Sequence, residues 1–389
     1  MMKKHIARIS ITILFFFFGG CGASWASRIP TIKDAMKVSD SAWGFVLLYI
    51  SIGTLITLPF AGNIVKKIGS KKGTIFFLVS YLLLLIGIGF WDSLLLLKLN
   101  LVVFGALGNM TNIAINTQAL NISKQYKGQI IGSLHGTWSI GGFIASWIGA
   151  EMIGLSVPPL NHFLVYSSIA IVLSIILFRN LLEDEIVDNN LEIKNTSKFV
   201  FPDKNLFLLG FLAFLAMVIE GTMMDWSSEY MKHIVKAPQD LIGYGLTAYM
   251  FMMASGRFLS DIVVHKLGPK ITIFISGLLI FIGLLSAVIF PTINSTIFSF
   301  MIVGIGVSGI VPLVYNTAGS NGKIPTEQAL TIITSIGFIG FFLGPPVIGF
   351  VAQTFSLKNA FFGIAFFGIA ITLVCNFIDF KTKKKESSI

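Results

Sequence analysis

Apolar blocks of about twenty residues follow one another along almost the whole of this 389-residue chain. An α-helix needs about 20 predominantly apolar residues to cross the hydrocarbon core of a bilayer. Only 12% of the residues are charged, whereas a typical soluble domain has about 25%. The sequence therefore predicts an integral membrane protein and excludes an ordinary water-soluble enzyme.

Twelve spans can be placed, and we expect an all-α membrane protein made of two pseudo-symmetric six-helix bundles. The longest polar stretch lies between spans six and seven. The predicted divisions are an N-terminal bundle at 1–178, a cytoplasmic linker at 179–205, a C-terminal bundle at 206–380 and a basic cytoplasmic tail at 381–389. The predicted spans are 8–27, 42–64, 74–91, 95–121, 128–153, 161–178, 206–226, 242–264, 271–291, 295–316, 328–352 and 359–378.

Basic residues are distributed unevenly between the loops on the two sides. Twenty of the 28 fall in loops on the side of the N-terminus, seven in the opposite loops, and Arg257 falls inside a span. By the positive-inside rule, this bias predicts a multi-pass protein with both termini in the cytoplasm. The net charge of +10 is thus a signal of topology, and nucleic acid is not an expected partner.

Cysteines and the start of the chain add little chemistry. Cys21 and Cys375 lie in separate apolar segments, so we expect no disulfide framework, no metal site and no cofactor. Two lysines followed by an apolar run that ends at Cys21 also resemble a lipoprotein signal. Because Phe18 is unusual three residues before a lipidated cysteine, an uncleaved first span is the favoured interpretation.

Short segments recur in the same order at an offset of about 200 residues. This near-constant offset predicts a duplicated six-span unit, and parallel repeats of this kind are a transporter architecture. The matches are 25–28 with 226–229 and Gly44 with Gly245 at 201, 67–71 with 266–270 at 199, 116–117 with 316–317 at 200, and 139–141 with 335–337 at 196.

The loop after span two carries a recognisable motif. Residues 62–72 read GNIVKKIGSKK, which resembles the Gly-x-Leu-Ala-Asp-Arg-x-Gly-Arg-Arg signature of the major facilitator superfamily. The resemblance implies the fold of that superfamily and assigns Gly62, Gly69 and Lys71 to a cytoplasmic gate. Lys66 stands where the superfamily usually has Asp, so the usual ion pair of that gate cannot be carried over.

Other segments resemble a bacterial inner-membrane branch of the superfamily, distantly similar to fucose permease. They are 135–139, 225–227, 256–261 and 267–269. The branch implies a location in the bacterial inner membrane. Span five lacks the Gly-Pro signature of the superfamily's drug/proton antiporters, and this absence favours symport.

Two acidic residues of span seven are candidates for proton coupling. An ionisable side chain inside a membrane is costly, so it is a functional candidate by default. Burial of Glu220 would favour its protonated form and let it exchange a proton near neutral pH; alternatively, it only holds neighbouring helices together. Asp225 is a second candidate, and it could also pair with Arg28 as an outer gate, the alternative being two solvated charges.

Polar and aromatic residues of spans four and five form a candidate substrate site. His135, Trp138, Ser139 and Gly142 share one helix face by their spacing. An imidazole titrates near neutrality, and an indole offers a hydrogen-bond donor and a flat face. The alternative is polar contact between helices. The predicted substrate-binding residues are Asn109, Asn112, Asn116, His135, Trp138 and Trp226.

Span eight carries Arg257 and Asp261 at positions i and i+4. This spacing allows an ion pair along the helix, and we expect the pair to brace a gate at the cytoplasmic end.

Together these observations predict a secondary active transporter and not an enzyme. The segment 319–324 lacks the spacing and the hydroxyl of a phosphate-binding loop, so ATP is not the expected energy source. We expect a monomer in the lipid bilayer that moves a small polar solute, sugar-like or another small metabolite, by alternating access with proton symport. The alternatives are a proton-coupled exporter or antiporter, and an acyltransferase-type enzyme with His135 as general base. Substrate, direction, coupling ion and stoichiometry do not follow from the sequence.

Overall fold

The computed structural model describes residues 2–126, 130–183, 202–319 and 326–380. At residues 2, 3, 261, 326 and 327 it describes the helical backbone but not the side chain. The predicted tail at 381–389 and most of the predicted linker lie outside this part of the chain.

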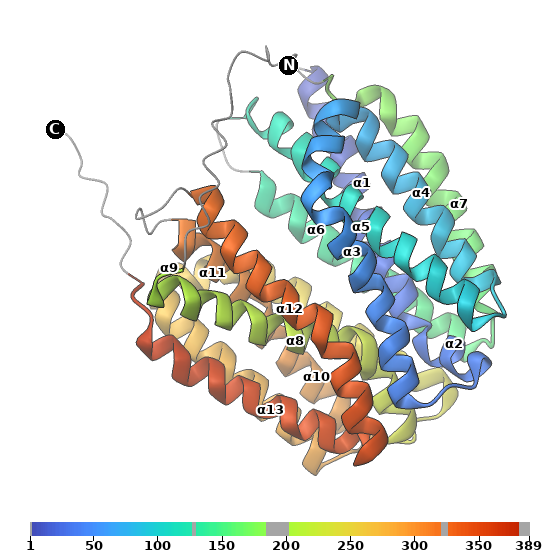
Figure 1. Ribbon diagram of the computed structural model, residues 1–389, viewed down its shortest axis with the longest axis vertical. Helices are drawn as coiled ribbons and strands as arrows, with labels where there is room; N and C mark the ends of the chain where they lie inside the picture. Colours follow the sequence, from blue (N-terminus) through green and yellow to red (C-terminus); the bar gives the residue numbers. More distant parts are fainter. Residues whose placement is uncertain (1, 127–129, 184–201, 320–325, 381–389) are drawn as a thin grey trace.

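The described residues fold into helices arranged as two bundles (Figure 1). The first bundle contains α1 (Met2–Ser27), α2 (Ile29–Met36), α3 (Asp40–Ile68), α4 (Ser70–Phe90), α5 (Leu94–Ser123), α6 (Ile131–Gly154) and α7 (Pro159–Leu177). The second contains α8 (Lys204–His233), α9 (Tyr244–Ile289), α10 (Ile293–Ser308), α11 (Ile310–Gly319), α12 (Thr326–Thr354) and α13 (Leu357–Val374). Single 3-10 turns occur at Phe178–Asn180, Gln239–Leu241 and Cys375–Phe377.

The all-helical membrane fold predicted from the apolar blocks is confirmed. Within the described ranges, ten helices are long and apolar enough to cross a membrane. The other two predicted spans, 128–153 and 242–264, correspond to α6 and the first part of α9. Spans eight and nine are the two parts of α9, separated by non-helical backbone at Gly268. The sequence did not reveal the short helix α2, nor that span ten divides into α10 and α11 at Gly309.

The same helix pairings occur in both bundles. In the first bundle α1 packs on α6, α3 on α5, and α4 on α5 and α7. In the second bundle α8 packs on α12, and the two parts of α9 pack on α10 and α13. The bundles meet through α3 with α12 and α6 with α9, which are equivalent pairs if the two halves are exchanged. This pattern of contacts agrees with the predicted duplication.

The bundles meet most closely at one end of the molecule. Residues 2 and 380 lie at one end, which we call the termini end, and α2 lies at the opposite or far end (Figure 1). Near the far end α3 and α12 cross with almost no side chain between them. A Cβ atom on Gly44 would lie 2.6 Å from the Pro345 carbonyl oxygen, and one on Gly349 would lie 2.5 Å from the Asp40 carbonyl oxygen. The ribbons diverge toward the termini end (Figure 1).

Two glycines that the sequence repeat aligns have the same unusual backbone. Gly69 (φ 90°, ψ 145°) joins α3 to α4, and Gly268 (φ 79°, ψ 161°) interrupts α9. Residues with a Cβ atom occupy this region only with strain. The short turn between consecutive spans therefore depends on glycine in both halves.

We predict that Gly69→Ala and Gly268→Ala each destabilise the protein by about 1–3 kcal/mol, the cost of strained backbone. A thermal unfolding series in detergent measures this as a lower midpoint for each variant.

The matched controls are Gly62→Ala and Gly363→Ala. Both glycines lie in helices, and a Cβ atom at either would have no neighbour within 4 Å. Alanine favours helix over glycine by about 0.5–1 kcal/mol, so their midpoints should stay the same or rise. Equal midpoints for all four variants would contradict the proposed need for glycine.

Candidate functional site

Arg257 of α9 connects three helices and both bundles. Its Nη1 atom donates a hydrogen bond to Ser139 Oγ of α6 at 2.7 Å, and its guanidinium carbon lies 5.3 Å from the centre of the Trp138 ring. Its Nη2 atom lies 3.6 Å from Glu220 Oε1 of α8. We call Trp138, Ser139, Glu220 and Arg257 the Arg257 cluster. The structure thus brings together residues that the sequence placed in three separate predicted spans.

The charges of this cluster are mostly shielded from solvent. The side chains of Arg257 and Glu220 are 22% and 15% exposed. At 3.6 Å the pair is an ion pair longer than a direct hydrogen bond. Two opposite charges in such a setting attract strongly, and removing one would leave the other buried without compensation.

Two tyrosines that the sequence did not single out complete the surroundings of Glu220. The hydroxyls of Tyr249 in α9 and Tyr315 in α11 are within electrostatic range of the carboxylate. The Tyr315 hydroxyl also accepts a hydrogen bond from Thr334 of α12 at 3.3 Å. Tyrosine is common at packed helix contacts, so sequence alone offered no signal for these positions.

His135 lies one turn before Trp138 on α6, on the face that the sequence predicted. Its ring contacts Phe15 of α1 edge-on, with 5.5 Å between ring centres, and it is within electrostatic range of Arg257. His135 is nevertheless exposed. The imidazole thus contacts α1 and is near Arg257 of α9 while it remains accessible. Since α6 begins at Ile131, this accessible side chain lies in the part of α6 toward the termini end.

The three asparagines of α5 make contacts of a different kind. Asn109 is buried and donates a hydrogen bond to Thr57 Oγ1 of α3 at 3.0 Å. Asn116 donates to Asn112 Oδ1 at 2.9 Å along the same helix. The hydrogen bond of Asn109 fits polar attachment between helices, whereas the Asn112 and Asn116 amides lie on a more open part of α5. Substrate contact by all three remains a prediction.

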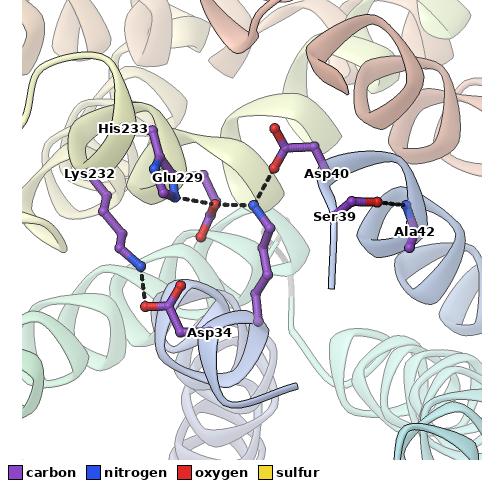
Figure 2. Close-up of polar contacts among 8 residues, drawn as sticks. Asp34, Ser39, Asp40, Ala42, Glu229, Lys232 and His233 are labelled. Carbon is purple, nitrogen blue, oxygen red and sulfur yellow. Dashed lines mark hydrogen bonds and ion pairs between the residues drawn. The ribbon is translucent and has the colours of Figure 1, made fainter. Parts of the chain in front are cut away.

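A second charged cluster lies at the far end, around Lys33 of α2 (Figure 2). The Lys33 ammonium lies 2.5 Å from Glu229 Oε2 of α8 and also donates to Asp40 at the start of α3. Glu229 Oε2 lies 3.3 Å from His233 Nε2, and Figure 2 shows Glu229 between His233 and the lysine ammonium. We call Lys33, Asp40, Glu229 and His233 the Lys33 cluster.

The pair of Lys33 and Glu229 joins the two bundles and is buried. The two side chains are 6% and 0% exposed. Burial by itself lowers the pKa of Lys33, but the Glu229 and Asp40 carboxylates outweigh burial and hold this pKa above its ordinary value. Lys33 is therefore charged throughout the physiological range of pH.

Trp226 belongs to the far end and not to the Arg257 cluster. It is fully buried, and the Lys33 ammonium lies 5.7 Å from the centre of its ring. A cation over an indole face is a favourable contact. The structure thus gives Trp226 a place beside Lys33, and its predicted contact with substrate is not tested.

The predicted pair of Arg28 and Asp225 is not formed. Arg28 is 1% exposed and donates to the Val157 carbonyl oxygen in the loop between α6 and α7, within its own bundle. Burial lowers its pKa to about 10. One helical turn beyond Asp225, Glu229 faces the first bundle and pairs with Lys33. The repeat aligns Arg28 with Glu229, which was a signal that Glu229 could lie between the bundles. Because α2 was not predicted, Lys33 could not be assigned as its partner.

The other predicted gate residues have mixed outcomes. The side chain of Asp261 lies outside the described residues. The described partners of Arg257 are the other members of the Arg257 cluster. Lys71 forms an ion pair with Glu183 at 2.7 Å, which ties the start of α4 to the segment after α7. Gly62 lies in α3, where an added Cβ atom would have no neighbour within 4 Å. A gating role for Gly62, Gly69 and Lys71 remains a prediction.

Comparisons with known proteins agree with this architecture. The sequence profile of the Major Facilitator Superfamily matches residues 9–318 and 206–388. An uncharacterised MFS-type transporter of Yersinia pestis is 30% identical over 92% of this chain and 93% of its own length. Membrane protein MosC of Rhizobium meliloti is 27% identical over 97% and 91%.

Two solved structures have the same fold at low sequence identity. A mutant of the nucleoside transporter NupG superimposes with a TM-score of 0.77 at 13% identity, covering 95% of this chain and 99% of that one. A bacterial homologue of the human lysosomal transporter Spinster, in an inward-facing and occupied conformation, gives 0.71 at 12% identity over 95% of each chain.

We predict that Lys33→Met lowers the thermal midpoint in detergent strongly, because it leaves Glu229 buried without its partner, a loss of about 3–5 kcal/mol. The raised pKa of Lys33 fixes the sign of the pH dependence. The stabilisation is complete below the ordinary lysine pKa of about 10.4 and disappears only as pH rises through the higher folded-state value. The difference from wild type should therefore persist without decline as pH rises from 7 to 9.

The control is Lys232→Met, one residue from His233. Lys232 forms the neighbouring pair between the bundles, with Asp34, but the two side chains are 22% and 57% exposed. Pairs exposed to this degree contribute about 0–1 kcal/mol. Equal losses in the two variants would show that burial does not distinguish the pairs.

Proposed function

The chain belongs to the major facilitator superfamily and is a secondary transporter, and we propose that it moves a small polar solute, sugar-like or another small metabolite, together with protons. The family and its relatives are transporters, so the acyltransferase alternative has no support from them. The proposal concerns what is carried, how it is coupled and which way it moves.

Alternating access is supported by where the bundles touch. At the far end, Lys33 pairs with Glu229, Lys232 with Asp34, Tyr244 donates to Glu151, and Gln239 donates to the Ile153 carbonyl oxygen; all four contacts join the bundles. The Arg257 cluster joins them nearer the middle. His135, in the part of α6 toward the termini end, is exposed. We propose that this arrangement is the inward-facing state, with the termini end in the cytoplasm.

The location follows from the same proposal. The excess of basic residues in loops on the N-terminal side favours a cytoplasmic position for both termini. The resemblance to a bacterial branch favours the inner membrane. We propose that the protein acts there as a monomer, with one substrate path between its two bundles.

One observation supports proton coupling by Glu220: its partner Arg257 also contacts the other bundle. Arg257 contacts Glu220 in its own bundle and Ser139 and Trp138 in the opposite one. Protonation of Glu220 would remove the charge that holds Arg257 near α8 and leave the guanidinium free to bind an oxygen of the substrate or of α6. A proton on Glu220 and the contact between bundles would therefore depend on one another. Asp225, on the same helix, is kept as the second candidate for this role.

Arg257 and the residues around it suggest the chemistry of the solute. Arg257 offers several N–H donors in a plane, Trp138 offers a flat face, and His135 can donate or accept. Such a set suits a solute with hydroxyl or carbonyl oxygens and an apolar ring face. A sugar fits this description, and so does a nucleoside, the solute for which the structurally similar nucleoside transporter NupG is named.

A proton-coupled exporter or antiporter remains the second candidate. Thermal-shift screening of purified protein against sugars, polyols, nucleosides, amino acids and organic acids would identify a substrate. In proteoliposomes with an inwardly directed proton gradient, symport accumulates that solute and antiport expels it.

We predict that Glu220→Gln abolishes accumulation driven by the proton gradient while leaving exchange of labelled for unlabelled solute within about twofold of wild type. The amide keeps the size of the side chain but cannot release a proton. Gradient-driven uptake and counterflow in the same liposomes measure the two activities.

The control is Glu151→Gln, which removes a carboxylate that accepts hydrogen bonds from Trp147 and Tyr244 at the far end of α6. It should retain gradient-driven uptake. Undiminished accumulation in Glu220→Gln would place the coupling group elsewhere, and Asp225→Asn would then be the next variant.

A further inference from the structure

The ion pair between Lys33 and Glu229 presents a physical difficulty for a transporter. The two side chains are 6% and 0% exposed and belong to different bundles. If the far end opens, the two charges must separate. Separating a dry ion pair leaves each charge buried without compensation, which costs several kcal/mol. A simple pair of this kind would hold the far end closed.

Each member of the pair, however, already contacts a second charged or ionisable group in its own bundle. Lys33 also donates to Asp40, and both belong to the segment formed by α2 and the start of α3. Ser39 caps α3 by accepting from the Ala42 N–H at 3.3 Å, which fixes the first turn where Asp40 lies. On the other side, Glu229 contacts His233 at 3.3 Å on the same helix.

These second partners lie nearer to water than the pair itself. The side chain of Asp40 is 32% exposed and that of His233 is 49% exposed. They can therefore keep a charge partly solvated when the dry contact is lost. The groups that act electrostatically on Glu229 are Lys33 and His233, and those that act on Lys33 are Glu229 and Asp40.

We propose that the Lys33 cluster is an exchange gate. In the closed far end, Lys33 and Glu229 hold each other across the bundles. In the open far end, Lys33 stays with Asp40 in the first bundle and Glu229 stays with His233 in the second. Asp40 and His233 are thus positioning residues that lower the cost of opening, and this proposal rests on the alternating access proposed above.

The expected effects follow from counting partners in each state. In the closed state Lys33 has two acidic partners, so loss of Asp40 leaves one. In the open state Asp40 is the partner that remains, so its loss costs more there. Asp40→Asn should therefore favour the closed far end. His233→Ala should do the same, because it removes the partner that Glu229 would keep in the open state. Glu229→Gln removes a charge that contacts both Lys33 and His233. The contact with Lys33 between the bundles is the more deeply buried of the two, so its loss weighs more and should favour the open far end.

The test is a distance measurement between nitroxide labels by pulsed electron paramagnetic resonance, with the full chain in lipid nanodiscs. Labels on Ala35→Cys and Gln353→Cys lie on exposed far-end positions, one in each bundle, and the buried Cys21 and Cys375 are replaced by alanine. A longer distance reports the open far end. Because Asp40 and His233 are partly exposed, we expect each substitution to lower the open fraction about two- to fivefold.

The remaining variants separate the possible failures. Glu229→Gln should raise the open fraction by at least about threefold, whereas Lys232→Gln, in the exposed neighbouring pair, should leave it within about 1.5-fold of wild type. The exchange gate is overturned if the open fraction rises in Glu229→Gln while at least one of Asp40→Asn and His233→Ala fails to lower it. That result leaves the transport proposal intact. One unchanged distance in every variant, including Glu229→Gln, contradicts alternating access itself.

Discussion

Hydrocarbon gives no solvation to a charged side chain, and the positions of the functional residues follow from this constraint. Charges inside a membrane protein must face a partner, a cavity or water. Here they gather between the two bundles, at the Arg257 cluster near the middle and the Lys33 cluster at the far end. Because each cluster contains residues from both bundles, a change of charge in either one alters how the bundles fit together. In the proposed mechanism, electrostatics and the motion of the bundles are thereby joined in the same few side chains.

Duplication gives the molecule two equivalent interfaces and two equivalent turns. The pairings of α3 with α12 and of α6 with α9 are exchanged by the repeat, and so are Gly69 and Gly268 with their left-handed backbone. The charged residues do not follow this symmetry. Arg28 and Glu229 occupy aligned positions in the sequence, yet one turns into its own bundle and the other reaches across. The scaffold is thus symmetric, whereas the chemistry is carried by residues that differ between the halves.

Much of the fold was predictable because a spanning helix has a fixed length and composition. The spacing along α6 also placed Trp138 and Ser139 on one helix face, since helix spacing determines which residues share a face; in the structure both contact Arg257 of the other bundle. Ion pairs between helices were not predictable in the same way. They depend on which way a side chain points at the end of a helix. The prediction placed Asp225 at the contact between bundles, whereas the residue found there is Glu229, one helical turn later. The pairing of Arg257 with Glu220 needed the relative positions of α8 and α9, which no spacing within one helix can supply.

The central claim is that the two bundles pivot, so that the far end opens as the termini end closes. Single-molecule fluorescence with one dye pair across each end, recorded separately in the same membrane, tests it most directly. Suitable exposed positions are Ala35 with Gln353 at the far end and Lys67 with Lys266 at the termini end. The account predicts two states whose populations match between the pairs, with long far-end distances in the state that has short distances at the termini end. Distances that lengthen together at both ends, or that stay fixed while solute is exchanged, would contradict it.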